Sequence, residues 1–290
     1  MCKTKKIVLL LLTAIVFMSF TACNLNNKES VSVKESEMYK EFDIEKTQIK
    51  EENVFSKDGI TVSLKNISYG DVETALNFDI KNDTDKKIKV VTSDFSVNGL
   101  MCLDAMMTDV NERAQKQGKI NISNEWLYDM GIKSIADIEY IIKIYDENNE
   151  EILSSDILKV KTDAPWHHSQ SYDKDGVKIY NKGGLLLSVK NIKKSSHSND
   201  TEIVFYAENN TDRTISIMAT EVFVNKKPIE PVFVITVGPK KKAVDSMLFY
   251  ESDLSSAQIS EITSVNAKFK AVNDSLETVF ETENVEIPVK

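Results

Sequence analysis

The sequence LNFDIKNDTD at residues 76–85 recurs as IVFYAENNTD at residues 203–212. In both stretches apolar residues occupy every second position and lead into a cluster of Asn, Thr and Asp. Side chains of a β-strand point alternately to its two faces, so each stretch predicts a strand with one buried face that ends in an Asx-type turn. A second alternating segment follows each copy and ends at Val97-Asn98 and Val224-Asn225. The chain therefore contains an internal repeat of β-structure.

The repeat extends in both directions from these stretches. Residues 54–67 and 179–192 keep the same register, and each contains a turn signal, Asp58-Gly59 or Gly183-Gly184, before an alternating apolar run. Further strands are predicted at 135–144 and 262–271, with short helical segments around Leu127 and Leu254. Many short strands with frequent turn signals are typical of an immunoglobulin-like β-sandwich. The sequence thus predicts an all-β fold with two tandem sandwiches, at 54–163 and 177–290, joined by a linker at 164–176.

Composition and charge agree with a folded, soluble body. The chain has 290 residues, of which 41% are hydrophobic and 28% charged, and this length allows about two domains. The formal net charge is −9, and removal of the N-terminal Lys3, Lys5 and Lys6 would make it −12. An acidic body is a poor nucleic-acid binder and is repelled by anionic lipid head groups, so we expect no nucleic-acid partner.

The N-terminus has the layout of an export signal at residues 1–22. A lysine-containing start precedes an apolar run at residues 7–20, which is shorter than the about 20 residues that a membrane-spanning helix needs. The following Thr21-Ala22-Cys23 resembles the lipobox of bacterial lipoproteins. The resemblance implies that Cys23 becomes the first mature residue and carries a diacylglycerol, which anchors the chain to the outer face of the cytoplasmic membrane. The alternatives are an ordinary signal peptide or an uncleaved anchor, in which Cys23 is incidental.

Residues 23–53 are rich in Asn, Lys, Glu and Ser and show no sustained apolar period, which predicts a flexible tether. The alternative for this segment is a frayed helix at residues 35–50. Among the cysteines, Cys2 would be lost with the signal and Cys23 acylated, so Cys102 alone would keep its thiol and no internal disulfide could form.

Three features carry a likeness to a known group of proteins: the Asn-x-Thr turns at 82–84 and 209–211, the Asp/Glu-x-x-Val-Asn corners at 94–98 and 221–225, and the Gly-Lys or Gly-Pro-Lys steps at 118–119 and 238–240. With these the chain resembles poorly characterised lipoproteins of Gram-positive bacteria that carry tandem immunoglobulin-like domains. The resemblance implies the fold and the anchor, and it implies no activity.

No catalytic or metal-binding motif stands out. A nucleophile elbow, a zincin helix, a phosphate-binding glycine loop and a dinucleotide fingerprint are all absent from the sequence. His167 and His168 are adjacent in the predicted linker, and Asp163, Asp173 or Asp175 would have to fold back to complete a metal site; a solvated linker is the favoured interpretation. The acidic turn at 146–151 lacks the glycine and the terminal Glu of an EF-hand, so a hairpin tip is favoured over a Ca²⁺ site. We therefore predict no metal, no cofactor and no enzyme activity.

The copies differ most in the segment after the Val-Asn corner. In the first copy this segment runs from Gly99 to Val110 with a polar tail, whereas in the second it reads as a shorter stretch at 227–234. Methionine-rich segments suit adaptable binding surfaces, which makes this segment a candidate loop for binding a partner. The alternative is that its apolar residues pack as another strand, with Cys102 a small buried residue. The candidate residues are Met101, Leu103, Met106 and Met107.

These features together predict a non-catalytic binding or spacer module at the cell envelope. Its expected partners are the membrane, through the diacylglycerol on Cys23, and an envelope protein or cell-wall ligand. The alternatives are an accessory subunit of a membrane or envelope complex and, less favoured, a hydrolase with an unrecognised site. The sequence leaves the oligomeric state open.

Overall fold

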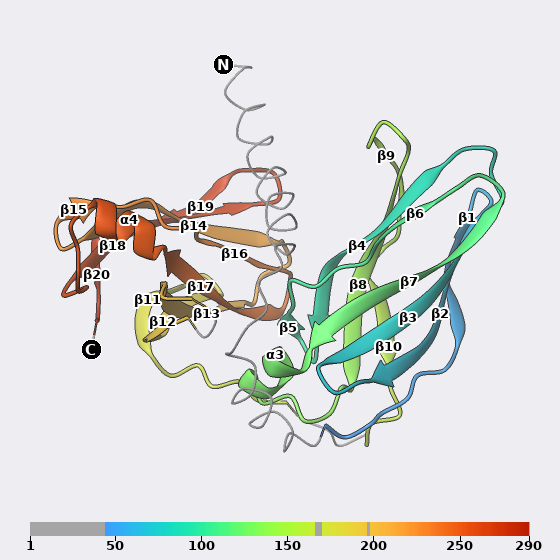
Figure 1. Cartoon of the computed structure of the whole chain (residues 1–290), viewed down its shortest axis with the longest axis horizontal. Helices are drawn as coiled ribbons and strands as arrows, with labels where there is room; N and C mark the ends of the chain where they lie inside the picture. The colour runs from blue at the N-terminus through green and yellow to red at the C-terminus, as the bar shows by residue number, and fades with distance from the viewer. Residues whose placement is uncertain (1–43, 166–169, 196–197, 290) are drawn as a thin grey trace. The chain divides into compact units, whose positions relative to one another are not determined.

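The computed structural model describes residues 44–165, 170–195 and 198–289 (Figure 1). The predicted signal peptide, Cys23, the tether up to residue 43 and the pair His167-His168 lie outside the described residues. Ile44 and Thr47 are buried, and β1 (Glu52–Lys57) begins before the predicted domain start at residue 54. Among the described residues, no helix combines the length and apolar character needed to cross a membrane.

The first copy of the repeat folds into two facing antiparallel sheets. One sheet has the order β1-β2-β3-β7, and Figure 1 shows these strands side by side. The other is built around β4 and β8, with β5, β6, β9 and β10 paired to them. The bounds of the strands after β1 are β2 (Ile60–Tyr69), β3 (Glu73–Asn82), β4 (Ile88–Val97), β5 (Leu100–Met101), β6 (Met107–Val110), β7 (Ala114–Ser123), β8 (Asp137–Tyr145), β9 (Glu151–Ser154) and β10 (Leu158–Lys161).

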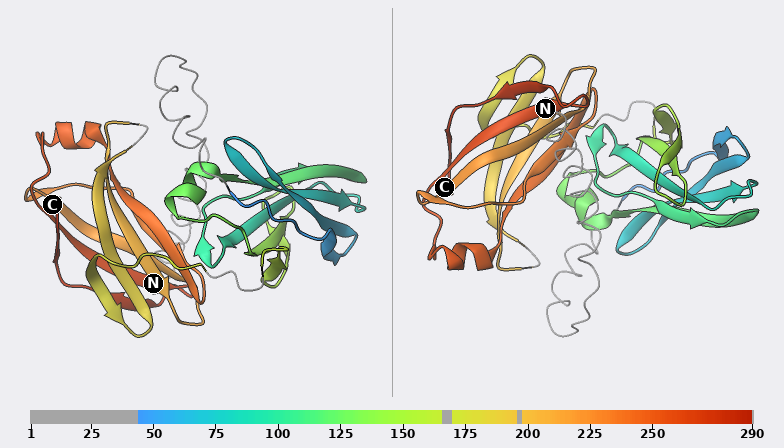
Figure 2. Two further views of the ribbon diagram at one scale, coloured as in Figure 1. Left: turned by 90° about the horizontal axis from the view of Figure 1, so that it is seen from below. Right: turned by 90° about the horizontal axis from the view of Figure 1, so that it is seen from above.

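The second copy repeats this arrangement element by element, including a short helix after the seventh strand of each copy, α3 (Asn124–Asp129) and α4 (Glu251–Ser256). Figure 2 shows the layered sheets of each copy from two further directions. The all-β prediction with two tandem sandwiches is therefore confirmed. The strands of this copy are β11 (Val177–Lys182), β12 (Leu185–Lys194), β13 (Thr201–Asn209), β14 (Ile215–Val224), β15 (Lys227–Pro228), β16 (Val234–Val237), β17 (Lys241–Phe249), β18 (Val265–Asn273), β19 (Thr278–Glu281) and β20 (Val285–Ile287).

The alternating apolar residues fill the space between the sheets, as the period of two requires. In the first sandwich the rings of Phe78 and Tyr140 meet edge to face across the core, with their centroids 5.8 Å apart. In the second sandwich Phe205, Phe233 and Phe269 form a cluster with centroid distances from 4.7 to 6.0 Å. Offset and edge-to-face aromatic pairs of this kind stabilise a core beyond the area they bury.

A buried asparagine organises the turn between the third and fourth strands of each copy. The amide oxygen of Asn82 accepts hydrogen bonds from the backbone N–H and the hydroxyl of Thr84, at 3.0 and 2.7 Å. Its amide nitrogen donates to the carbonyls of Lys86 and Asn111, at 2.8 and 2.9 Å. Asn209 makes the corresponding bonds in the second copy, to Thr211 and to the carbonyls of Arg213, Val237 and Gly238. The predicted turn chemistry is present at both sites.

The Val-Asn corners are also equivalent in the two copies. Asn98 and Asn225 both have positive φ, 50° and 51°, a conformation that asparagine tolerates better than most residues. The amide oxygen of Asn98 accepts from the backbone N–H groups of Ala136 and Asp137, and that of Asn225 accepts from those of Thr263 and Ser264. Each corner thus fixes the start of the long strand that crosses the core, β8 or β18.

Residues Asp43–Lys290 form one compact unit, and a short pairing of strands contributes to it. Leu100 of β5 pairs in parallel with Lys242 of β17, whose N–H donates to the carbonyl of Gly99 at 3.0 Å. The preceding residue, Lys241, forms an ion pair with Glu139 at 2.8 Å. The segment after β4 in the first copy is therefore held by the second copy.

One inward-facing position differs between the copies in a way that affects stability. On β7 it is occupied by Gly118, which pairs with Phe78, and on β17 by Asp245, which pairs with Phe205. Burial raises the pKa of the Asp245 carboxyl to about 6, although a hydrogen bond from the Ser246 N–H opposes this rise. A carboxyl whose pKa is higher in the folded than in the unfolded state stabilises the fold at low pH, and this stabilisation is lost as the pH rises through about 6.

We predict that Asp245→Asn raises the free energy of unfolding by about 1–2 kcal/mol at pH 7.5, because the partly buried carboxylate no longer has to ionise. At pH 4 the variant and the wild type should agree within about 0.5 kcal/mol. Denaturant titrations at both pH values measure this difference, with the exposed Asp85→Asn as the control. Equal effects of Asp245→Asn at the two pH values would contradict the explanation.

Candidate functional site

The predicted binding loop is not an insertion. β5 and β6 of the first copy have counterparts β15 and β16 in the second, and the same number of residues separates β4 from β7 as separates β14 from β17. The prediction of a shorter second segment is wrong because Gly118 and Gly238, which look equivalent in the sequence, are not: Gly118 pairs with Phe78, and its counterpart in the second copy is Asp245, which pairs with Phe205. The segments differ in chemistry, and the candidate residues of the first copy fall into three environments.

Met106 and Cys102 belong to the core of the first sandwich. The Met106 side chain is 1% exposed and occupies the space above Gly118, where an added Cβ would lie 2.2 Å from its sulfur. The backbone N–H of Met106 donates to the hydroxyl of Thr92 at 2.7 Å. Cys102 is buried, its thiol donates to Asp104 at 3.1 Å, and burial raises the pKa of this thiol well above its usual range. The placement of Met106 on a binding surface is therefore wrong, because no partner can reach it.

Met101 contacts the other copy of the repeat. Its side chain is partly buried against the core cluster of the second sandwich, and its sulfur lies 3.5 Å from the position that a Cβ on Gly238 would occupy. Together with the pairing of Leu100 and Lys242, this contact uses Met101 to hold the two copies together. Met101 is therefore used in a contact between the two copies of the repeat, within the same chain.

Leu103 and Met107 are exposed, with 83% and 49% of their surfaces accessible. Leu103 is the most exposed large hydrophobic side chain of the described residues, and Val72, at 78%, is the second. Val72 lies in the turn between β2 and β3, where its carbonyl accepts from the N–H of Asn124 at 3.0 Å. Burial raises the pKa of the Asp104 carboxyl, next to Leu103, and the charge of Glu73, next to Val72, raises it further. We call Val72 and Leu103 the apolar tip.

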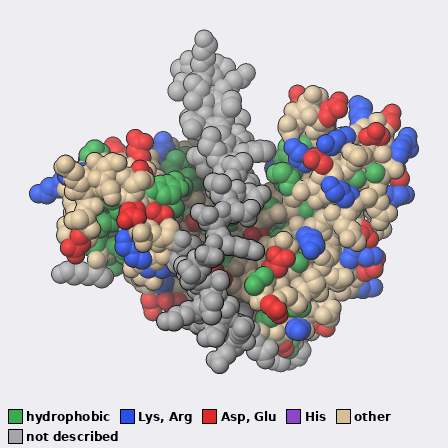
Figure 3. Space-filling view, in the orientation of Figure 1, with side chains coloured by type: hydrophobic (Ala, Val, Ile, Leu, Met, Phe, Trp, Pro, Cys, Tyr) green, Lys and Arg blue, Asp and Glu red, His purple; other side chains and the backbone are tan. Residues whose placement is uncertain are grey.

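Acidic residues are sequence neighbours of both residues of the apolar tip. Asp71 and Glu73 flank Val72, and Asp104 follows Leu103. Elsewhere on the face of the first sandwich that Figure 3 shows, acidic and basic side chains are interspersed and do not gather by sign. The tip therefore combines two protruding aliphatic side chains with a local excess of negative charge.

The described part of the chain begins at the same end of the first sandwich. The N–H of Glu45 donates to the carbonyl of Lys133 at 2.7 Å, directly after α3. The hydroxyl of Thr47 donates to the carbonyl of Ile135 at 2.8 Å, and the Thr47 N–H donates to the Tyr69 hydroxyl at 3.0 Å. Tyr69 is the last residue of β2, just before the turn that carries Val72. Any anchor upstream of residue 44 would thus be attached at this end.

The polar clusters considered in the sequence have structural roles where they are described. Asp146 accepts hydrogen bonds from the backbone N–H groups of Asn148 and Glu150, both at 2.9 Å, and these bonds hold its pKa below the usual range. The Asp146 carboxylate is thereby used to cap its own turn. Within the described residues, no group of three or more His, Cys, Asp or Glu side chains has the arrangement of a metal site.

The comparisons with known proteins gave structural similarity at low sequence identity. No family model and no curated protein matches the chain. Solved structures similar to it include the Salmonella enterica SafA pilin in complex with the SafB chaperone, at 14% identity over 81% of this chain and 99% of that one, with a TM-score of 0.21. The Pseudomonas aeruginosa CupB2 chaperone is 12% identical over 73% and 91%, with a TM-score of 0.20. Red sea bream transglutaminase is 9% identical over 91% and 34%, with a TM-score of 0.22.

We predict that substitutions at two residues of the loop change stability by very different amounts. Met106→Ala should lower the free energy of unfolding by about 2–4 kcal/mol, because it leaves a cavity above Gly118. Leu103→Glu should change it by less than about 0.5 kcal/mol, because the side chain is exposed. Chemical denaturation measures both effects. A destabilisation by Leu103→Glu as large as that by Met106→Ala would show that Leu103 packs in the folded protein.

Proposed function

We propose that this protein is a non-catalytic binding module, anchored at the outer face of the cytoplasmic membrane through Cys23, and that its apolar tip contacts a protein partner. The observation that carries the proposal is the exposure of Val72 and Leu103 on two loops of the first sandwich, whose neighbouring residues Glu73 and Asp104 interact electrostatically. A single exposed aliphatic residue needs no explanation, but neighbouring protruding side chains on loops are a common feature of interaction sites. The lipobox-like residues 21–23 support the anchor.

The charge around the tip favours a protein over the lipid surface as the contact. Asp71, Glu73 and Asp104 would bring three carboxylates close to anionic head groups if Val72 and Leu103 inserted into the bilayer. A protein segment with aliphatic and basic side chains would instead cover the apolar pair and lie close to the carboxylates. Electrostatic complementarity of this kind mainly sets orientation and the rate of association.

The position of the tip fits an anchored protein. The chain enters the first sandwich beside Lys133 and Tyr69, at the end that carries Val72. An acylated Cys23 would leave the segment up to residue 43 between the membrane and this end. The tip would then meet partners that are themselves close to the membrane, which is consistent with a role as an accessory component of an envelope assembly.

The anchor gives one prediction. Cys23→Ala should move the protein from the membrane fraction to the soluble extracytoplasmic fraction, because the thioether-linked acyl chains supply the membrane affinity. Fractionation of cells and mass determination of the N-terminal peptide measure this change. Retention of Cys23→Ala in the membrane, together with an N-terminal peptide of unmodified mass in the wild type, would contradict the anchor.

The tip gives a second prediction. A partner that co-purifies with the tagged wild-type protein from membranes should be reduced at least tenfold by Leu103→Glu, because a fourth carboxylate would replace the aliphatic side chain that the partner's aliphatic groups cover. The matched control is Val232→Glu, which places a charge on a half-exposed residue of the corresponding segment in the second copy. Unchanged recovery of the partner with Leu103→Glu, in protein of wild-type stability, would contradict the role of the tip.

A further inference from the structure

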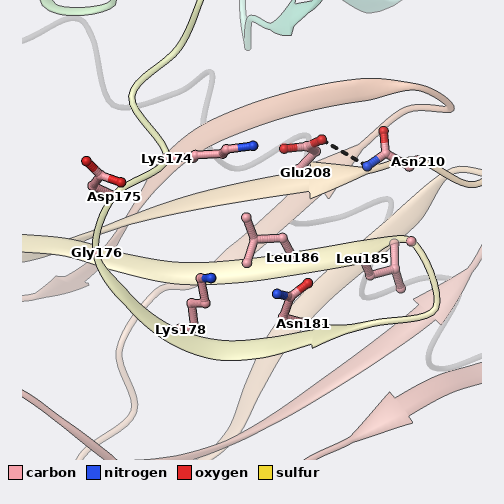
Figure 4. Close-up of a pocket in the computed structure, with 10 residues that line it drawn as sticks. Lys174, Asp175, Gly176, Lys178, Asn181, Leu185, Leu186, Glu208 and Asn210 are labelled. Atoms are coloured by element: carbon pink, nitrogen blue, oxygen red, sulfur yellow. Dashed lines mark hydrogen bonds between the residues drawn. The ribbon is translucent and has the colours of Figure 1, made fainter.

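A groove of about 340 Å³ lies on the outer face of the second sandwich, away from the residues of the apolar tip. Leu186 of β12 lies in its middle, as Figure 4 shows. Lys178 and Asn181 project into it from β11 on one side, and Glu208 and Asn210 lie along the other side at the end of β13. The volume is at the lower end of the range for small-molecule sites, which is about 300–1,000 Å³.

The segment that borders the groove, residues 173–176, is fixed to the sheet. The ammonium group of Lys190 donates to the carboxylate of Asp173 at 2.7 Å and to the carbonyl of the same residue at 3.0 Å, and it also bonds the carbonyl of Asp175. Gly176 passes so close to β12 that an added Cβ would lie 2.2 Å from the carbonyl oxygen of Val189. The groove is thus bounded by a segment whose position is set by several contacts.

The two copies differ at the positions that form the groove. Leu186 on the outer face of β12 corresponds to Thr61 on β2, and Glu208 on β13 corresponds to Lys81 on β3. In the first copy Lys81 forms an ion pair with Asp83 at 2.7 Å. The second copy therefore has an aliphatic floor and a carboxylate where the first has a hydroxyl and an internally paired cation.

Opposite charges face each other across the floor. The Glu208 carboxylate accepts from the amide of Asn210 at 2.9 Å and from the hydroxyl of Tyr206 at 3.2 Å. Burial acts to raise its pKa, but these hydrogen bonds and the charges of Lys242 and Lys174 outweigh burial and hold the pKa below the usual range, so the group is ionised at neutral pH. Lys178, on the other side, has no hydrogen bond or ion pair with any residue that the structure describes. The two hydrogen bonds leave further acceptor positions on the Glu208 carboxylate.

We infer that this groove binds a short zwitterionic ligand of peptide type, with its carboxylate at Lys178 and Asn181, its ammonium group at Glu208 and its chain over Leu186. A ligand without a carboxylate would leave Lys178 without a charged partner, whereas a zwitterion pairs with both Lys178 and Glu208. The side-chain amides of Asn181 and Asn210 can each donate to and accept from a peptide group. Lys174 points toward Glu208 from the bordering segment, so a ligand ammonium group would share this carboxylate with Lys174 (Figure 4).

The test uses the whole chain in detergent micelles and triglycine as the probe, followed by calorimetry and by NMR of the leucine methyl groups. We expect a Kd on the order of 1 mM and a shift of the Leu186 methyl signals on binding. Lys178→Gln and Glu208→Gln should each weaken binding about tenfold, because each removes one charged partner. Lys81→Gln, at the position in the first copy that corresponds to Glu208, is the matched control and should leave binding unchanged.

Capped peptides test the assignment of the two ends. Triglycine amide, which has no carboxylate, should bind about tenfold more weakly than triglycine, and Lys178→Gln should not weaken it further. N-acetyl triglycine, which has no ammonium group, should bind about tenfold more weakly than triglycine, and Glu208→Gln should not weaken its binding further. The inference is overturned if triglycine does not bind, if the capped peptides bind as well as triglycine, or if a neutral oligosaccharide shifts Leu186 and triglycine does not. These results are independent of the apolar tip, because Leu103→Glu should leave triglycine binding unchanged.

Discussion

The buried amides of Asn82 and Asn209 are the constraint on which both sandwiches depend. Each side chain is at most 1% exposed. Asn82 donates to the carbonyls of Lys86 and Asn111, and Asn209 donates to those of Arg213 and Gly238. A buried amide without partners would cost about 1–3 kcal/mol per unpaired group, so the surrounding backbone has little freedom to move. This explains why both copies keep the same Asn-x-Thr turn and the same path from the third to the fourth strand.

Because these internal contacts fix the backbone, the outward-facing residues of the sheets can change without changing the fold. The outer face of the first sandwich is polar at residues such as Asn77 and Asp79, and Asn77 donates to Asn66 at 2.8 Å. The corresponding residues of the second sandwich are Val204 and Tyr206, and Tyr206 is fully buried. The two copies thus share one framework and carry different surfaces, and the proposed binding sites lie where the surfaces differ.

The sequence was sufficient to predict the strands, the turns and the class of fold, because the period-two pattern and the Asn-x-Thr clusters act locally. It was insufficient to predict which apolar residues of the loop are buried and which are exposed. Met106 and Leu103 are both apolar residues in an irregular segment, and their difference in burial depends on Gly118, which lies on β7 of the facing sheet and leaves room for the Met106 side chain. Such a contact between distant residues has no signal in the local pattern.

The groove was missed for a similar reason. Residues 173–176 appear as a polar linker in the sequence, and their attachment depends on Lys190 and on the close approach of Gly176 to Val189. The glycine in an otherwise charged segment was the one available signal, since glycine often marks a close approach of two backbones. The beginning of the packed body was also missed, because Ile44 and Thr47 are isolated buried residues in a polar stretch and form no periodic pattern.

In-cell cross-linking of the tagged full-length protein, with the cross-linked peptides identified by mass spectrometry, tests the central claim that a protein partner contacts the first copy at its apolar tip. The account predicts one reproducible partner whose cross-links fall in residues 70–73 and 102–105, with none in the corresponding residues 229–232 of the second copy. Cross-links distributed equally over both copies, or no captured protein, would contradict it.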